Sequence, residues 1–200
     1  MTYELPRDPY TAPVTGVMHN LLGLKDLAEL DEAERTEVAV ATAASLQNLT
    51  PTVWNASLLC LLHRRLFGGI YAWAGTYRTV EISKGTSRFA AAAYIAGQTD
   101  AVLAELNDEV AAWRQGDERT PRRIAHYYSE LNAIHPFREG NGRTIRLFLS
   151  LLALQYGWYL DWSKTTAAEN LQACAEAFYG DEARLTALMV TVAVRANEGA

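Results

Sequence analysis

The chain has 200 residues, and half of them are hydrophobic, which is enough to build one compact domain with a substantial core. Its net charge is −5 and its pI is about 5.4, so a nucleic-acid-binding groove is not expected. No internal repeat, low-complexity tract or linker divides it, and we therefore expect a single domain over residues 1–200.

The first part of the chain is predicted to be extended and then helical. Residues 1–13 hold three of the six prolines, which favours an extended segment. Asp31 and Glu34 have the spacing of a capping box, and they predict a helix from residue 31 to about residue 49. A second helix is predicted over residues 55–67, because two glycines follow it and can end it.

The segment of about residues 76–90 is predicted to form a β-hairpin. It contains four residues that favour strands: Tyr77, Thr79, Val80 and Ile82. Lys84-Gly85 or Gly85-Thr86 can supply the turn. This hairpin is the one piece of β-structure that the pattern predicts.

Helical patterns fill the rest of the chain, over residues 91–113, 120–135, 143–156, 165–178 and 181–196. An apolar stripe runs along the helix that ends near His135: Ile124, Tyr127, Tyr128, Leu131 and Ile134. The helix over residues 143–156 is almost wholly apolar below its first turn, so we expect it to be central and buried, with Gly157 as its stop. The predicted fold class is all-α, a compact helical domain with one short β-hairpin.

Residues 135–146, His-Pro-Phe-Arg-Glu-Gly-Asn-Gly-Arg-Thr-Ile-Arg, are the most informative stretch of the sequence. Pro136 disfavours helical geometry at the residue before it, so a helix should end at His135 and present the imidazole there. Histidine has a pKa near neutrality and can accept a proton as a general base. Glu139 is a hard oxygen ligand of the kind that Mg²⁺ takes together with substrate phosphates.

The second half of this stretch is suited to bind an anion. Gly140, Asn141 and Gly142 supply backbone that can approach a ligand closely and offer it successive N–H groups. The helix that follows directs the positive end of its dipole to the same place. Arg143 and Arg146 lie on one face of its first turn, where cations oppose the dipole unless an anion is bound. The stretch therefore predicts a site that holds the phosphates of a nucleotide and activates a hydroxyl beside them.

The other candidate residues have ordinary structural interpretations. His63 and His126 lie among apolar residues on predicted helices, and the four histidines show no zinc-ligand spacing. Cys60 and Cys174 are interpreted as small buried hydrophobes of a reducing compartment. The N-terminus lacks the build of a signal peptide, and no apolar run could span a membrane. We therefore expect a cytoplasmic protein with no membrane contact, and leave export by a specialised secretion machine open.

Residues 135–146 match the Fic motif, H-P-F-x-(D/E)-G-N-G-R-x-x-R, at every position, and the chain resembles the Fic proteins. Further segments resemble the approach to the Fic flap, the flap itself and the closing helices of the family: residues 63–78, 79–85, 161–164 and 179–181. The resemblance covers roughly residues 45–195. It implies one Fic domain that transfers AMP from ATP to a protein hydroxyl and releases pyrophosphate.

The resemblance also implies roles for the matching residues, with ATP and Mg²⁺ as the bound molecules. His135 would deprotonate a Tyr, Thr or Ser hydroxyl of the target protein, and Glu139 would hold Mg²⁺. The nucleotide would be bound by Lys84, Gly85, Gly140, Asn141, Gly142, Arg143 and Arg146. The target would dock on the flap through Thr79, Val80, Ile82 and Ser83. Gly142 stands where the related Doc kinases carry Lys, which favours AMP transfer. Bacterial topoisomerase subunits and host GTPases are the targets that the family suggests.

The sequence allows two hypotheses about the source of the glutamate that controls the activity. Fic enzymes are commonly inhibited by a glutamate in the motif (S/T)-x-x-x-E-(G/N), which pairs with the second motif arginine. Residues 165–170 fit this pattern through Glu169, but the family has an ordinary core helix there, which Thr165 would cap. Residues 8–24 resemble the start of toxins whose inhibitory glutamate lies on a separate protein. This second reading implies a small helical antitoxin that places a glutamate against Arg146.

Two other functions stay open at this point. The same phosphate-binding residues could serve the transfer of UMP, phosphocholine or a phosphoryl group. The chain could also be a nucleotide-sensing module without catalysis, although the intact His135 and Glu139 count against that reading.

Overall fold

The computed structural model describes residues 8–84 and 87–196, and most of them are helical. In chain order the elements are α1 (Leu27–Asn48), α2 (Ala56–Phe67), β1 (Ser83–Lys84), β2 (Ser87–Arg88), the 3-10 turn η1 (Ala92–Tyr94), α3 (Ile95–Val110), α4 (Thr120–Ile134), α5 (Asn141–Gln155), β3 (Trp158–Leu160), the 3-10 turn η2 (Trp162–Lys164), α6 (Ala167–Phe178), α7 (Ala183–Val192) and β4 (Ala193–Arg195). The expected all-α fold class is confirmed.

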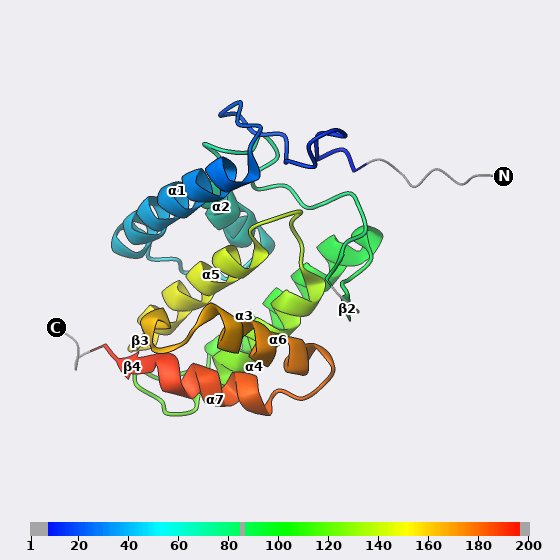
Figure 1. Ribbon diagram of the computed structural model, residues 1–200. Helices are drawn as coiled ribbons and strands as arrows, with labels where there is room; N and C mark the ends of the chain where they lie inside the picture. Colours follow the sequence, from blue (N-terminus) through cyan, green and yellow to red (C-terminus); the bar gives the residue numbers. More distant parts are fainter. Residues whose placement is uncertain (1–7, 85–86, 197–200) are drawn as a thin grey trace.

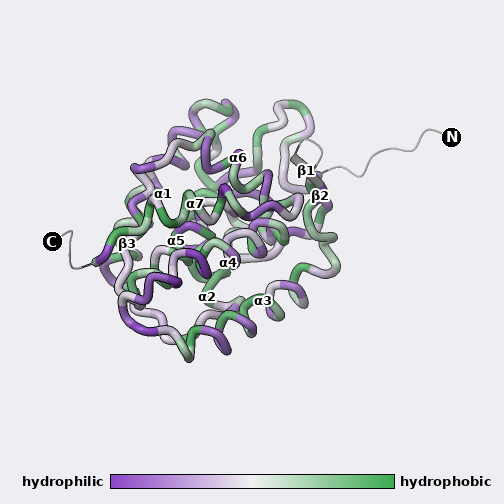
Figure 2. Tube along the Cα trace, turned by 90° about the horizontal axis from the view of Figure 1, so that it is seen from below, coloured by the Kyte–Doolittle hydropathy of each residue, from purple (hydrophilic) through white to green (hydrophobic). Residues whose placement is uncertain are grey.

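Helix α5 runs through the middle of the molecule (Figure 1). It contacts α1 and α2 on one side and α4 on the other, and β3 follows its C-terminal end. Ten of its fifteen residues are buried, as predicted for the central helix. Helices α6 and α7 pack on α4, and the view from below shows α4 and α5 near the middle with α3 at the edge (Figure 2). Because α5 is held on several sides, its N-terminal turn has a fixed place next to the end of α4.

Helix ends agree with the prediction where the right cap residue was recognised. The Asn55 side chain caps α2, and Gly68 follows the last residue of that helix. Helix α1 begins four residues before the predicted start at Asp31. The predicted start is wrong because the Asp26 side chain accepts hydrogen bonds from two backbone N–H groups of the first turn, which makes it the N-cap.

The predicted hairpin forms, but it is shorter than expected. Ser83 pairs with Arg88 in an antiparallel register, and each strand has two residues, so most of the predicted span 76–90 is irregular. The turn residues 85 and 86 lie outside the described part of the chain. Each strand of a two-stranded hairpin keeps one edge that its own ladder does not use.

A second antiparallel ladder, which the sequence analysis did not predict, joins β3 to β4. Its second strand starts directly after α7 ends at Val192, so the helix predicted over residues 181–196 is too long. Residues 193–195 have a helical pattern, but pairing with the strand that follows α5 satisfies their backbone groups instead.

The N-terminal segment folds back on itself within residues 8–18. Thr11 and Met18 form an isolated antiparallel bridge, so the described part of segment 1–13 is not simply extended. Asp8 binds Arg138 and ties this segment to the loop after α4. In the described residues, no helix combines the length and the apolar character needed to cross a membrane.

Candidate active site

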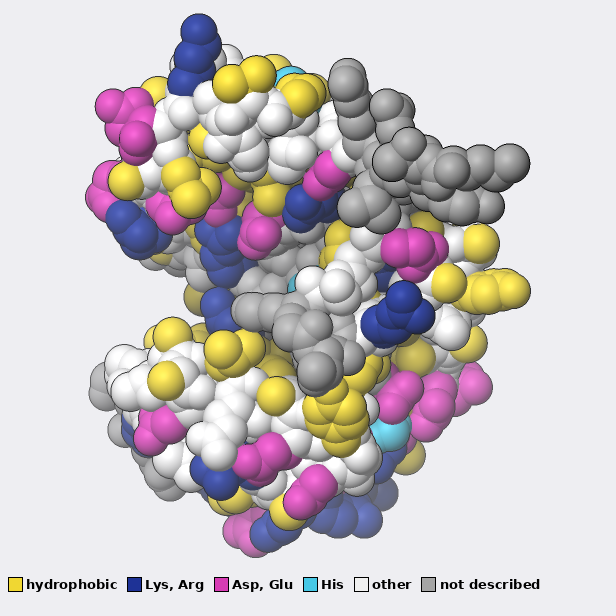
Figure 3. All heavy atoms as spheres, turned by 45° about the vertical axis from the view of Figure 1, so that its right-hand side comes forward, with side chains coloured by type: hydrophobic (Ala, Val, Ile, Leu, Met, Phe, Trp, Pro, Cys, Tyr) yellow, Lys and Arg dark blue, Asp and Glu magenta, His cyan; other side chains and the backbone are white. Residues whose placement is uncertain are grey.

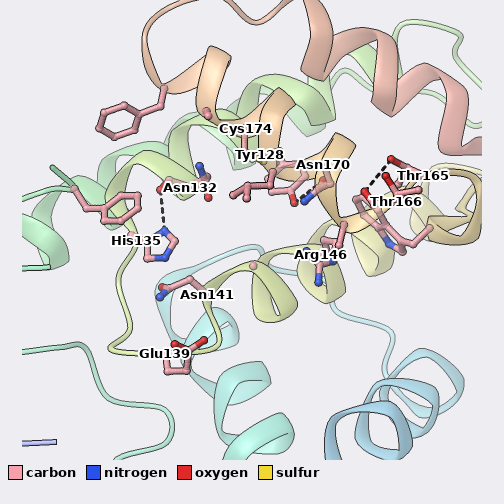
Figure 4. Close-up of a pocket in the computed structure, with 17 residues that line it drawn as sticks. Tyr128, Asn132, His135, Glu139, Asn141, Arg146, Thr165, Thr166, Asn170 and Cys174 are labelled. Carbon is pink, nitrogen blue, oxygen red and sulfur yellow. Dashed lines mark hydrogen bonds between the residues drawn. The ribbon is translucent and has the colours of Figure 1, made fainter. Parts of the chain in front are cut away.

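A cavity of about 740 Å³ lies between the loop after α4, the start of α5, and helix α6. Figure 3 shows the molecule hollowed between its upper and lower parts, with Lys and Arg side chains recessed in the hollow and hydrophobic side chains on its lower rim. In Figure 4, the motif residues His135, Asn141 and Arg146 face Tyr128 and Asn170 across this space. A cavity of this size is typical of a site for a small organic ligand.

His135 lies at the C-terminal end of α4, as Pro136 predicted, with a left-handed backbone at φ 51°. Its Nδ1 lies 3.1 Å from the carbonyl oxygen of Asn132. Because a carbonyl oxygen can only accept, Nδ1 carries the proton in the neutral ring and Nε2 carries the lone pair. The Phe89 ring stacks on the imidazole with centroids 3.9 Å apart, which fixes the plane of the ring. The basic nitrogen of the neutral ring is therefore Nε2.

The loop between α4 and α5 is closed by its own side chains. Asn141 accepts a hydrogen bond from the Phe137 N–H at 2.7 Å and donates one to the Phe137 carbonyl at 2.7 Å. Phe137 is completely buried and so anchors the loop in the core. The Asn141 amide therefore holds the loop, and the backbone at the start of α5 is what faces the cavity for anion binding.

His63 supports the same loop from below. Its Nδ1 accepts the Gly75 N–H at 2.8 Å, and its Nε2 lies 3.0 Å from the carbonyl oxygen of Glu139 and donates to it. Burial lowers the pKa of His63 to about 4, so the ring stays neutral. The structural interpretation of His63 is right, but the sequence carried no signal that its partner would be the motif loop.

Gly140 and Glu139 form the floor of the turn. Gly140 has φ +80°, and a Cβ at this position would lie 2.3 Å from the Phe67 ring, so only glycine fits. The Glu139 carboxylate accepts the Gly140 N–H at 2.9 Å and lines the cavity, as does Gly142. The structure therefore brings His135, Glu139 and Gly142 to the wall of one cavity.

The motif arginines do not gather at one point. Arg146 lines the main cavity, with its guanidinium carbon 5.8 Å from the centre of the Trp162 ring. Arg138 turns away to pair with Asp8, with 2.5 Å between Nη2 and Oδ2. Arg146 is therefore the motif arginine that is placed for a ligand in this cavity.

Arg143 is held on the opposite side of the loop. Its Nη2 lies 2.5 Å from Oε2 of Glu34 on α1 and 3.4 Å from Oε1 of Glu139. Glu34 is only 6 % exposed, and the Tyr71 hydroxyl donates to its other carboxylate oxygen. Arg143 lines a smaller cavity of about 280 Å³ instead of the main one. The sequence could not identify Glu34 as the partner of Arg143, because the two residues are far apart in the chain and the spacing of Glu34 indicates only a capping role on its own helix.

Of the described flap candidates, Thr79, Val80, Ile82 and Ser83 do not line the cavity. The Thr79 N–H donates to the Tyr10 hydroxyl at 3.2 Å, the Val80 carbonyl accepts from Arg78, and Ile82 is half-buried before strand β1, which Ser83 begins. Lys84 contributes its backbone to β1, and Gly85 lies outside the described residues. Of the described residues of this hairpin, Phe89 is the one that lines the cavity, and the sequence analysis missed it.

Residues 165–170 form the start of α6. Thr166, and not Thr165, is the N-cap, and it forms a capping box with Glu169. The Glu169 carboxylate accepts the Thr166 N–H at 2.8 Å. Thr165, Thr166 and Asn170 line the cavity, whereas Glu169 faces the helix start.

Comparison with known proteins identifies the family. The sequence profile of the Fic/DOC family matches residues 53–153. The protein adenylyltransferase VbhT of Bartonella schoenbuchensis is 38% identical over 190 residues, which are 94% of this chain and 39% of that protein. A probable protein adenylyltransferase, Fic of Salmonella typhimurium, is 36% identical over 192 residues, which are 96% of this chain and 95% of that protein. This chain thus spans less than half of VbhT but nearly the whole length of the Salmonella relative.

The fold agrees with that of a solved Fic structure. BepC of Bartonella tribocorum, crystallised with AMPPNP, has a TM-score of 0.86 at 24% identity, and the match covers 93% of this chain and 96% of that one. The enzyme class implied by the sequence, protein adenylyltransferase, is confirmed by the curated relatives. With the matching family profile, and with relatives of more than 30% identity that cover nearly the whole chain, this chain belongs to the Fic/DOC family.

Proposed function

We propose that this protein transfers AMP from ATP to a hydroxyl side chain of a target protein. The observation that carries the proposal is the arrangement of one cavity, which is lined by His135, by Glu139, by Asn141 and Gly142 of the first turn of α5, and by Arg146. AMPPNP in the BepC structure makes an adenine nucleotide the first donor to test.

The chemistry is an in-line displacement at the α-phosphorus. His135 Nε2 takes the proton of the target hydroxyl, and the hydroxyl oxygen forms the new bond to phosphorus. The bond from that phosphorus to the bridging oxygen breaks, and pyrophosphate leaves with the electron pair. The backbone at Gly142 holds the inner phosphates, joined by the Gly140 N–H once it leaves the Glu139 carboxylate, and Arg146 holds the outer one. Catalysis then comes mainly from positioning and charge neutralisation. Arg143 would have to leave Glu34 before it could reach a phosphate of a nucleotide in this cavity.

Glu139 is suited to hold Mg²⁺. Of the described residues that line the cavity, it is the only carboxylate, and its side chain is 44% exposed. Mg²⁺ commonly takes one or two protein carboxylates and completes its shell with phosphates and water, so the site fits the ion. When bound, the ion would neutralise charge on the phosphates. We expect Glu139→Gln to weaken ATP binding in the presence of Mg²⁺ more than in its absence.

The decisive experiment uses ATP labelled at the α-phosphate and a bacterial lysate as the source of targets. The intact chain should label one or a few proteins, and His135→Ala should lower the rate by ~10²–10⁴, the usual effect of losing a general base. ATP binding by His135→Ala should stay within a few-fold of wild type, because the imidazole acts on the incoming hydroxyl. His126→Ala is the matched control and should label normally. Labelling by His135→Ala at the wild-type rate would refute the proposal.

Parallel reactions identify the transferred group. Label from the γ-phosphate of ATP would indicate phosphoryl transfer, and label from UTP or CDP-choline would indicate UMP or phosphocholine transfer. We expect label from the α-phosphate of ATP alone, because Gly142 leaves open the space that a longer side chain would fill; a Cβ there would already lie 3.3 Å from Arg146 Nη1.

Control is proposed to come from a separate small helical protein that places a glutamate against Arg146. A charge-assisted Arg–carboxylate pair contributes ~1.5–3 kcal/mol, enough to compete with one phosphate contact. Glu169 is bound to the start of its own helix, which supports an external source of that glutamate. Expressed alone in a bacterial host, the chain should therefore act as a toxin and arrest growth, and His135→Ala should not. Normal growth with active wild-type protein in the cell would refute the toxin role.

A further inference from the structure

Arg78 is a buried cation whose contacts join two parts of the active site. It is a charged side chain and yet only 2% exposed. Its Nε donates to the carbonyl oxygen of His135 at 2.9 Å, and its Nη2 donates to that of Ile134 at 3.2 Å. Its own backbone N–H donates to the Pro136 carbonyl at 2.9 Å. Three consecutive residues at the end of α4 are thus bound by one arginine.

The same guanidinium also binds both ends of the hairpin. Nη1 donates to the Val80 carbonyl at 2.8 Å, before β1, and Nη2 donates to the Ala90 carbonyl, after β2. The acceptors that the described residues supply are all backbone carbonyl oxygens. The two from α4 lie at the negative end of its dipole, where a cation is stabilised. Arg78 therefore fixes the hairpin and the end of α4 relative to each other.

These contacts reach the imidazole by two routes. Arg78 binds the carbonyl of the one described non-glycine residue with positive φ, a conformation that persists only where its surroundings enforce it. Phe89, which precedes the bound Ala90, stacks on the His135 ring. A shift of the hairpin would therefore disturb two contacts of His135. One is the hydrogen bond from Arg78 to its carbonyl oxygen, and the other is the stacking of the Phe89 ring on its imidazole.

We propose that Arg78 is a positioning residue that couples the hairpin to His135, so that the imidazole holds its working orientation when the hairpin is in place. This inference rests on the proposed function. An arginine is needed because its planar fork can donate in several directions at once, whereas the three N–H groups of a lysine radiate from a single atom. Arg78 touches neither the cavity nor a reacting atom, and so it acts only through His135 and the hairpin.

The test compares Arg78→Lys with Arg123→Lys, which weakens a structural ion pair between α3 and α4. NMR signals of the imidazole rings of His63, His126 and His135 are recorded in the absence of substrate, with His135 assigned by its loss in His135→Ala. In Arg78→Lys the His135 signals should move, because the stacked Phe89 ring shifts them, while those of His63 and His126 stay. In Arg123→Lys the His135 signals should not move. A merely structural role would move the His63 signals as well, which would overturn the proposal.

The kinetic arm separates positioning from binding. Arg78→Lys should bind AMPPNP within about threefold of wild type, because Arg78 does not contact the motif turn that would hold the phosphates. Its rate of lysate labelling should fall about tenfold or more, as expected when a catalytic group is displaced by a fraction of an ångström to one ångström. Labelling at the wild-type rate, or a parallel loss of AMPPNP affinity, would overturn the proposal.

Arg78→Gln is the second variant, and failure of both variants to fold would show that the residue is structural. If the wild-type chain labels no protein at all, the proposed function fails, while the NMR comparison still tests the coupling.

Discussion

At the scale of single residues, the motif loop is held in shape by groups that a ligand would not have to supply. The Asn141 amide binds the backbone of Phe137, and the His63 ring binds the carbonyl of Glu139. The turn is therefore formed before any nucleotide arrives. A preformed set of N–H donors stabilises charge on phosphate without the cost of ordering the loop during the reaction.

Gly140 is the residue whose replacement tests this preformed turn. Gly140→Ala adds a Cβ at φ +80° and 2.3 Å from the Phe67 ring, so we expect the free energy of unfolding to fall by about 3 kcal/mol, from backbone strain plus overpacking. Gly180→Ala is the matched control, since Gly180 also has positive φ but no atom near its Cβ position, and it should cost about 1 kcal/mol. Urea denaturation measures both. Equal losses would mean that Phe67 moves aside without cost.

Glu169 tests the choice between internal and external control. Its carboxylate accepts from the Thr166 N–H and completes the capping box of α6, so Glu169→Gly should lower the free energy of unfolding and leave AMP transfer by the isolated chain unchanged. Gln172→Gly, at an exposed site of the same helix, controls for the lower helix propensity of glycine. A sharp rise in the labelling rate of Glu169→Gly alone would make residues 165–170 an internal brake and the separate partner unnecessary.

At the scale of elements, the hairpin is the part that a target is expected to meet. Its strands are short and leave backbone groups available, which suits main-chain pairing with an extended target segment. Ile82→Pro removes an N–H just before β1 and fixes φ, so we expect it to abolish target labelling while AMPPNP affinity stays within a few-fold. Titration with AMPPNP measures the nucleotide affinity of the variant, and lysate labelling measures its modification of targets. Loss of both to the same degree would show that the segment serves the fold.

Helices α3 and α4 are joined by a polar cluster around Glu109. Arg123 Nε donates to its carboxylate at 2.6 Å, and the Tyr127 hydroxyl donates at 2.6 Å. The Arg123 guanidinium in particular lowers the pKa of Glu109 from 4.5 to about 2. A carboxyl whose pKa is lower in the folded state stabilises the fold above its unfolded pKa, and this contribution is lost as the pH falls toward the folded pKa.

The stability difference between wild type and Glu109→Gln should therefore shrink between about pH 5 and about pH 2, because the glutamine variant lacks this titration. Urea denaturation of both proteins at several pH values in this range measures the difference in unfolding free energy. The contributions of the other carboxylates cancel, because they are present in both proteins. A difference that stays constant over the range would show that the pKa of Glu109 is not lowered.

At the scale of the whole molecule, one buried ion pair joins the N-terminal helix to the catalytic one. Glu34 of α1 binds Arg143 of α5, so Glu34→Ala would leave the Tyr71 hydroxyl without its acceptor and Arg143 with only the more distant carboxylate of Glu139. We expect a loss of about 3 kcal/mol in unfolding free energy. Glu32→Ala removes the exposed pair with Arg35 on the same helix and should cost less than about 1 kcal/mol. If urea denaturation gives similarly small losses of unfolding free energy for Glu34→Ala and Glu32→Ala, the buried pair does not stabilise the fold.

Features that depend on a few neighbouring residues could be predicted from the sequence. Pro136 predicted that α4 ends at His135, because the clash of a proline ring with the preceding residue is local. The apolar run after Arg146 predicted that α5 is central, because a helix without a polar face must be covered on all sides. The phosphate site stays a prediction, and it too rests on neighbouring residues, because the groups that would bind the anion lie within one loop and one helical turn.

Only the tertiary structure decided which partner each charged group meets. The spacing of Arg143 and Arg146 placed both on one face, but the fold lays Glu34 of α1 against the first and leaves the second at the cavity. Arg78 and His63 looked ordinary in the sequence, yet both bind backbone oxygens of the motif loop. The β3–β4 ladder and the early end of α7 have the same origin. In each case the local pattern allows several outcomes of similar energy, and the choice is made by groups far away in the chain that the fold brings within hydrogen-bond distance.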